Sequence, residues 1–167
     1  MNDKASFLGA DFIGQMSQHF SSSGHALFGE MAIEVSRFEA PEIEFLMPFN
    51  LNFVSDTKTG AYSPGVYTIL MDSVLGIGSL VAIGTPVPVA TLSLTVDYVA
   101  PNQAAEALRA VGWADVLTDD IAYASGNLYG VDSGALLARA NGAFAIKTKG
   151  PSLGEGLLQK LANGDAE

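Results

Sequence analysis

One carboxylate, Asp72, stands within a long apolar stretch that runs from Val66 to Ile83. A charge is costly to bury unless it is paired or used, and a partly desolvated carboxylate is a stronger base than a hydrated one. Asp72 is therefore a candidate general base for a water molecule, or a nucleophile that attacks a carbonyl carbon. The alternative is a narrow polar strip on one side of a helix, facing solvent or a neighbouring element, formed by residues at helical spacing: Thr68, Asp72, Gly76 and Ser79.

The start of the apolar stretch carries a second candidate group. Ser63 is a favourable N-cap, and Pro64 suits the first position of a helix, where its missing N–H has no helical partner. The free N–H groups of a helix start and the helix dipole suit a developing negative charge, which makes Gly65 a candidate oxyanion donor. The alternative is that Gly65 only permits the turn. Ser63 is expected to be the N-cap and not a nucleophile, since the sequence places no base beside it.

The elements that must position these groups follow from the spacing of apolar residues. A helix is expected from Ser63 to about Ile83, where the sequence GTPVP ends it. Another helix is expected over residues 5–20, and residues 54–65 are expected to form a loop. Six segments have strand character: 29–40, 41–50, 89–101, 105–120, 121–132 and 135–149. This order predicts an α+β fold in which an antiparallel sheet wraps around one long central helix, with an N-terminal helix.

The strand over 89–99 shows the clearest alternation. Its apolar face is expected to carry Ala90, Leu92, Leu94, Val96 and Tyr98. The opposite face is expected to carry Thr91, Ser93, Thr95 and Asp97. Thr91 is either an ordinary strand threonine or a group that orients a water molecule against Asp72. Hairpin turns are expected near Asp119-Asp120 and at the sequence VDSG.

The composition excludes several classes of function. The 167 residues suffice for one domain with a core, and 49% apolar with 16% charged residues is typical of a globular chain. A net charge of −10 with only 8 Lys and Arg argues against nucleic-acid binding and against docking on an anionic membrane. The stretch Val66–Ile83 has the length of a membrane span, but its charge and the strands after it favour a core helix. With no cysteine, no metal-ligand spacing and no secretory signal, a cytoplasmic location and no metal are expected.

Three stretches carry a family resemblance: LFGEMAIEVSRFEAPEIEFLMPFN, PGVYTILMDSVLG and TLSLTVDYVAP. With them the sequence resembles, from about Leu27 to Lys147, the hotdog-fold acyl-CoA thioesterases, in particular the phenylacetate-pathway (PaaI-like) branch. In that family a His-Gly-Gly turn enters the helix, and six residues separate its last Gly from an acidic residue. Gly65 and Asp72 have that spacing, and Thr91 matches a polar residue early in the next strand.

The resemblance implies an activity and roles for these residues. The activity is hydrolysis of acyl-CoA or aryl-CoA thioesters, with Asp72 as general base or nucleophile, Gly65 as oxyanion donor and Thr91 orienting the water. CoA enters as part of the substrate, and no separate cofactor is implied. The chain then divides into an N-terminal helical segment (1–26), a hotdog domain (27–149) and a C-terminal tail (150–167).

The sequence departs from the family at the helix entrance. The family's His falls on Ser63, its first Gly on Pro64, and a loop Asn on Thr57. In such relatives the amide of the first Gly helps to hold the thioester carbonyl, and Pro64 has no N–H to do so. The amide of Gly65 or Val66 would have to replace that donor.

The same region supplies the substrate-binding candidates. They are Tyr62 and Ser63, which occupy the place of the missing His, together with Val66 and Lys58. The ammonium of Lys58 is suited to a CoA phosphate, and the alternative is a solvated surface charge.

Two other functions and an assembly follow from the same residues. Loss of the His-Gly-Gly turn favours a non-catalytic or regulatory protein that binds acyl thioesters. An acyl-carrier dehydratase of the hotdog type would need an acid five residues after Gly65, where Leu70 stands, and an upstream His that is absent. A homodimer or dimer of dimers is expected, because a curled sheet leaves edges to cover. The resemblance implies a site shared by two chains, with the donor near Gly65 from one and Asp72 with Thr91 from the other.

Overall fold

The structure, a computed structural model, describes residues 26–39, 41–84, 87–100 and 105–148. The helix predicted over residues 5–20 and the tail from 150 lie outside these ranges. In chain order the elements are α2 (Ala26–Met31), β1 (Glu34–Glu39), β2 (Glu42–Met47), the 3-10 helix η2 (Leu51–Phe53), β3 (Val54–Asp56), β4 (Ala61–Tyr62), α3 (Pro64–Ile83), β5 (Val89–Tyr98), β6 (Leu108–Leu117), β7 (Ile121–Gly130) and β8 (Leu136–Ile146).

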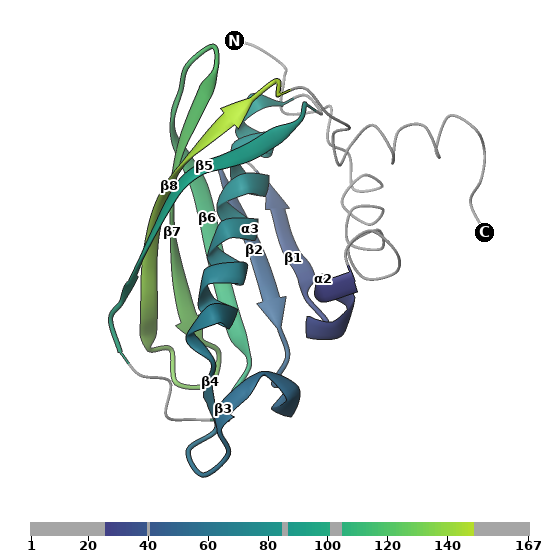
Figure 1. The fold of residues 1–167 in the computed structure, drawn as a ribbon, viewed down its shortest axis with the longest axis vertical. Helices are drawn as coiled ribbons and strands as arrows, with labels where there is room; N and C mark the ends of the chain where they lie inside the picture. The colour runs from purple at the N-terminus through teal and green to yellow at the C-terminus, as the bar shows by residue number, and fades with distance from the viewer. Residues whose placement is uncertain (1–25, 40, 85–86, 101–104, 149–167) are drawn as a thin grey trace, which may run out of the picture.

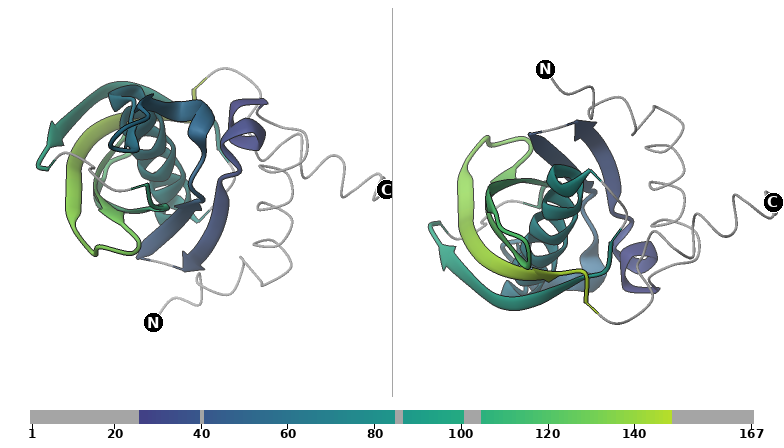
Figure 2. Two further views of the ribbon diagram at one scale, coloured as in Figure 1. Left: turned by 90° about the horizontal axis from the view of Figure 1, so that it is seen from below. Right: turned by 90° about the horizontal axis from the view of Figure 1, so that it is seen from above.

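Six strands form one antiparallel sheet in the order β1-β2-β6-β7-β8-β5. The sheet runs alongside α3 in Figure 1, and the two end-on views of Figure 2 show it curled around the helix. Strands β2, β5, β6, β7 and β8 all contact α3. The predicted α+β architecture, with an antiparallel sheet wrapped around one long central helix, is therefore confirmed.

Helix α3 begins at Pro64 and ends at Ile83, as the sequence predicts. Gly84 terminates it with a left-handed φ of 71°, and the Gly84 N–H donates to the carbonyls of Leu80 and Val81. By length and composition α3 passes as a membrane span, but 61% of its apolar window is buried inside the protein. A helix that is apolar on most sides is what the centre of a curled sheet requires.

Strand β5 contains a bulge that the sequence pattern does not reveal. Thr91 pairs with Phe144 of β8, and Ser93 pairs with Ala143, so Leu92 is an extra residue without a partner of its own. An extra residue in one strand reverses which face the side chains beyond it occupy. The two-residue alternation along β5 is therefore broken at Leu92.

The bulge corrects the predicted faces of β5. Thr91 shares the inner face with Leu94 and Val96, both of which pack against the core around α3. Leu92, expected on that apolar face, is 58% exposed, and Ala90 is exposed as well. The prediction that Ala90 and Leu92 lie on the same face as Leu94 is wrong, and the polar Thr91 points toward the helix.

A short hairpin replaces the loop expected over residues 54–65. Strands β3 and β4 pair in antiparallel fashion within it. The carboxylate of Asp56 accepts hydrogen bonds from the Lys58 N–H at 2.9 Å and the Thr59 hydroxyl at 3.0 Å, and Gly60 takes a positive φ of 76°. These turn contacts are local, and they close the hairpin that leads into α3.

The other elements lie close to their predicted positions. The first strand begins at Glu34 and not at residue 29, because the segment up to Met31 is helical and buries the Met31 side chain. The expected turns are present at both hairpins. Thr118 and Ile121 close the first through the Thr118 N–H and hydroxyl, which donate to the Ile121 carbonyl.

Candidate active site

Asp72 and Thr91 meet between α3 and β5. The Thr91 hydroxyl donates to Oδ1 of Asp72 at 2.8 Å, and the Asp72 side chain is half-buried while Thr91 is exposed. Within the described residues no donor contacts Oδ2, the second carboxylate oxygen of Asp72. One oxygen is thus fixed by the strand and the other can accept a proton from a water molecule. The bulge at Leu92 makes this contact possible, since it turns Thr91 inward.

The polar strip predicted along α3 is not a single surface. At its start, the Thr68 hydroxyl lies 3.3 Å from the Tyr98 hydroxyl of β5. Gly76 faces the Phe144 ring, since a Cβ added there would lie 3.5 Å from the ring. Ser79 is fully buried and donates to the Leu75 carbonyl of its own helix at 2.9 Å. Asp72 is therefore not one member of a uniform solvated stripe.

The entrance to α3 leaves one exposed amide. Ser63 stands at the N-cap position, but its side chain makes no capping hydrogen bond. The Val66 N–H donates to the Ser63 carbonyl at 2.9 Å, and Val66 is buried. Pro64 has no N–H. Gly65 is exposed and its N–H has no acceptor among the described residues, so of the two predicted replacement donors Gly65 is the one available to a ligand.

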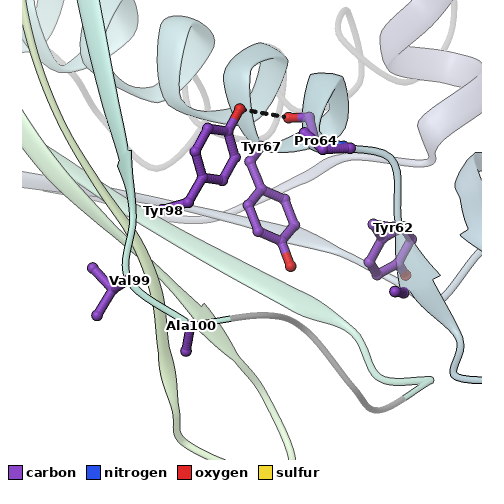
Figure 3. A pocket seen from close by; sticks show the side chains of 7 residues that line it. Tyr62, Pro64, Tyr67, Tyr98, Val99 and Ala100 are labelled. Atoms are coloured by element: carbon purple, nitrogen blue, oxygen red, sulfur yellow. Dashed lines mark hydrogen bonds between the residues drawn. The ribbon is translucent and has the colours of Figure 1, made fainter.

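Tyr98, at the end of β5, contacts this entrance and was not predicted as a site residue. Its hydroxyl donates to the Pro64 carbonyl at 3.1 Å (Figure 3). The same hydroxyl lies 3.3 Å from the Thr68 hydroxyl. Its ring stacks on Tyr67, with centroids 5.9 Å apart and an interplanar angle of 27°. The sequence shows an aromatic residue with a hydroxyl at the end of this strand, which could have marked Tyr98 as a site residue. The alternation of apolar and polar residues instead placed Tyr98 on the apolar face of the strand.

A pocket of about 400 Å³ opens beside the entrance to α3. Figure 3 shows the tyrosine rings and Pro64 around it, and its lining is Ala61, Tyr62, Pro64, Tyr67, Tyr98, Val99 and Ala100. Aromatic and apolar walls with a few polar groups are typical of small-molecule sites.

Of the four predicted substrate-binding residues, Tyr62 lines this pocket. Its hydroxyl donates to the Glu106 carbonyl at 3.1 Å, and burial raises the pKa of Tyr62 above its ordinary value, which keeps the hydroxyl neutral. Ser63 and Val66 adjoin the pocket in sequence without lining it. Lys58 is exposed in the turn between β3 and β4. Among the described residues no cluster of His, Cys, Asp or Glu could hold a metal ion.

Comparison with known proteins finds likeness in structure only. No family model and no curated protein matches the sequence. A thioesterase from Haemophilus influenzae superposes with a TM-score of 0.70 at 16% identity, covering 80% of this chain and 89% of that one. A thioesterase family protein from Silicibacter pomeroyi superposes with a TM-score of 0.69 at 14% sequence identity, and the match covers 80% of this chain and 97% of that one. Zebra fish thioesterase superfamily member 2 superposes with a TM-score of 0.68 at 13% sequence identity, and the match covers 81% of this chain and 96% of that one. The chain has the hotdog fold.

The two halves of the candidate site lie apart within one hotdog protomer. Gly65 and Asp72 are seven residues apart on one helix, which at about 1.5 Å per residue separates them by about 10 Å along its axis. The two groups are thus about two helical turns apart in the same chain. Leu70, where a dehydratase would need its acid, is fully buried in the core.

Proposed function

We propose that this hotdog protein hydrolyses acyl-CoA or aryl-CoA thioesters, with Asp72 as the general base or nucleophile. The observation that carries the proposal is the 2.8 Å hydrogen bond from Thr91 to Asp72. It holds a half-buried carboxylate in one orientation and leaves Oδ2 open, as activation of a water molecule requires. The fold shared with thioesterase structures supports the same reaction class.

In the general-base form of the reaction, Asp72 takes a proton from water. The water oxygen bonds to the thioester carbonyl carbon, and the carbonyl π electrons move onto its oxygen, which the Gly65 N–H stabilises. The tetrahedral intermediate then re-forms the carbonyl and breaks the C–S bond. The thiolate takes the proton from Asp72, so that the products are a carboxylic acid and a thiol. Thr91 keeps Asp72 oriented throughout.

We further propose that two protomers build each site. The separation of about 10 Å between Gly65 and Asp72 along one helix supports a site in which the oxyanion donor comes from one chain and the base from the other. Strand β5, which carries Thr91, is at an edge of the six-stranded sheet that the described residues form, and such an edge can pair with a second copy. A homodimer or dimer of dimers in the cytoplasm, acting on a small-molecule thioester without a further cofactor, is the corresponding assembly.

The second candidate function is a non-catalytic protein that binds acyl thioesters. Pro64 at the helix entrance favours it, because the amide that holds the carbonyl in catalytic relatives is absent there. The Val66 N–H is already engaged with the Ser63 carbonyl, so Gly65 alone would have to compensate.

A panel of acyl-CoA and aryl-CoA thioesters with thiol detection separates these functions. Saturable thiol release that exceeds spontaneous hydrolysis supports the enzyme. Binding of the same thioesters, followed by calorimetry, without any thiol release supports the binding protein. Hydration of a 2-enoyl-CoA without thiol release would point to the dehydratase reaction and contradict both.

A further inference from the structure

The outer face of strands β7 and β8 presents an uncharged surface. Helix α3 lies on the concave side of the curled sheet, and the residues of β7 alternate between that side and the outer, convex side (Figure 2). At the start of β7 the outer face carries three residues, whose partners on β8 share that face: Ile121 with Ala145, Tyr123 with Ala143 and Ser125 with Asn141. No Asp, Glu, Lys or Arg occupies these six positions, and Tyr123 is 45% exposed. This surface is therefore suited to an apolar contact.

Two bulges add large apolar side chains at the borders of this surface. Asp115 is an extra residue in β6, so that Val116 and not Asp115 pairs with Tyr123 and shares its face. Leu92 is the extra residue of β5, beside Ser93. Val116 is 54% exposed and Leu92 is 58% exposed. A bulge re-aims the side chains beside it, and each bulge here coincides with an exposed aliphatic residue.

The charges of the chain favour a second copy as the partner of this surface. The Asp115 carboxylate on β6 is already engaged, because it accepts hydrogen bonds from the Trp113 indole N–H at 2.8 Å and from the Ser125 hydroxyl. A basic partner would be attracted by acidic side chains, and the six paired positions hold none. Two copies of a chain with a net charge of −10 repel each other, and an uncharged contact keeps that repulsion small.

The sizes of the side chains are self-complementary about a two-fold axis. The outer positions of β7 are large where those of β8 are small, since Tyr123 pairs with Ala143 and Ile121 with Ala145. An axis that runs along the strands between β7 and β8 would lay β7 of one copy over β8 of the other, as in the aligned packing of two sheets. Each large side chain then lies over a small one. Arg139, farther along β8, lies over the uncharged β7 residue that pairs with it and not over another cation.

We infer that this surface is an interface between two copies of the chain, in which Tyr123 of each copy packs over Ala143 of the other. The inference extends the proposed assembly and is independent of the proposed hydrolysis. Where two chains also pair edge to edge through β5, the contact between sheet faces joins two such pairs into a dimer of dimers.

The first test adds a charge at the centre of the surface. Tyr123→Glu is compared with the parent by light scattering at micromolar concentration. Leu51→Glu is the control, because Leu51 is 67% exposed on η2, outside the six-stranded sheet. The mass of Tyr123→Glu is expected to be half that of the parent, because unpaired carboxylates would be buried in each contact, and Leu51→Glu is expected to keep the parental mass. A monomeric parent, or a Tyr123→Glu variant with the parental mass, overturns the inference.

The second test exchanges the large and the small residue. Ala143→Tyr places a second ring over Tyr123 of the other copy and is expected to lower the mass. The double variant Tyr123→Ala with Ala143→Tyr again sets a large residue over a small one, and it is expected to regain the parental mass. A double variant whose mass stays at that of Ala143→Tyr contradicts the two-fold pairing. Neither test involves turnover, so failure of the proposed hydrolysis leaves both expected results unchanged.

Discussion

At the residue scale, the chemistry depends on where single hydroxyl and amide groups point. The Asp72 carboxylate accepts a hydrogen bond from Thr91 of β5, whereas an ordinary polar residue on a helix surface contacts only solvent or its own helix. The helix entrance offers Gly65 as an exposed amide, while the Val66 amide is engaged in the first turn. The candidate site therefore has a carboxylate with one fixed oxygen and a reduced set of oxyanion donors.

Thr91→Val tests the hydroxyl that holds Asp72. Valine keeps the branched shape of threonine in β5, and the charge-assisted hydrogen bond of 2.8 Å is lost. We expect kcat to fall about 10- to 100-fold, as the loss of a hydrogen bond to a charged group predicts. Thr95→Val, which removes an exposed hydroxyl from the same strand, is expected to keep the parental kcat. Equal kcat values for both variants would make Thr91 an ordinary strand residue.

Pro64→Gly, combined with Ser63→His, tests whether the helix entrance limits the rate. The change supplies an N–H where proline has none, and one restored oxyanion donor predicts a kcat higher by up to about 10²-fold. Glycine also raises the conformational entropy of the unfolded chain, which lowers the free energy of unfolding by about 1 kcal/mol. Pro88→Gly is the control, because Pro88 does not line the pocket. It is expected to lower the free energy of unfolding by a similar amount and to leave kcat unchanged. Unchanged turnover in the double variant would show that Pro64 is not limiting.

At the element scale, α3 organises both the core and the site. The residues Leu70, Met71, Val74 and Leu75 are fully buried under the sheet. Gly112 of β6 permits close approach, since a Cβ added there would lie 2.8 Å from the Val74 carbonyl oxygen. The helix and the sheet are thus in backbone contact at this point.

Gly112→Ala and Gly76→Ala test that contact as a pair. Alanine at Gly112 would force helix and sheet apart, and we expect the free energy of unfolding to fall by about 1–3 kcal/mol. At Gly76 the added Cβ would meet the Phe144 ring at an ordinary 3.5 Å, and the higher helix propensity of alanine is worth up to about 1 kcal/mol. Chemical denaturation measures both values. Similar effects at the two positions would contradict the close packing at Gly112.

The sequence predicted the elements better than their local registers. Both ends of α3 were predicted, because Ser63-Pro64 and the glycine after Ile83 are strong local signals. The faces of β5 were assigned wrongly, because a bulge adds one residue without any mark in a two-residue alternation. The pairing of Asp72 with Thr91 came from the family resemblance. Tyr98 was not among the predicted site residues, because its contact with the Pro64 carbonyl arises from the fold and cannot be read from spacing.

At the scale of the whole molecule, one edge of the described sheet points to assembly. Strand β5 is ten residues long, and in the described sheet only β8 pairs with it. Leu92 and Val99, at and just beyond β5, are large apolar residues that stand more than half exposed. An open edge of this kind is normally paired or covered. We therefore expect light scattering to report a dimer or a dimer of dimers, and a monomer at micromolar concentration would contradict the shared site.

Mixed dimers test whether two chains share each site. Asp72→Asn removes the base, and Gly65→Pro removes the exposed amide at a position in the first helical turn where proline is tolerated. If the donor and the base come from different chains, a mixed dimer of these variants contains one intact site, and activity returns toward half the parental value per dimer. Each variant alone should stay inactive. No recovery after co-expression would place both groups in one chain.

The central claim is that thioester hydrolysis depends on the Asp72 carboxylate. Its most direct test is the kcat of Asp72→Asn against the parent on the best thioester of the panel, with circular dichroism and light scattering to verify fold and assembly. Asp120→Asn, in the exposed turn between β6 and β7, is the matched control and is expected to keep the parental kcat. We predict that kcat of Asp72→Asn falls by at least about 10²-fold in a folded protein of unchanged assembly. An Asp72→Asn variant that hydrolyses thioesters as fast as the parent would contradict the claim and leave Asp72 as a polar residue held by Thr91.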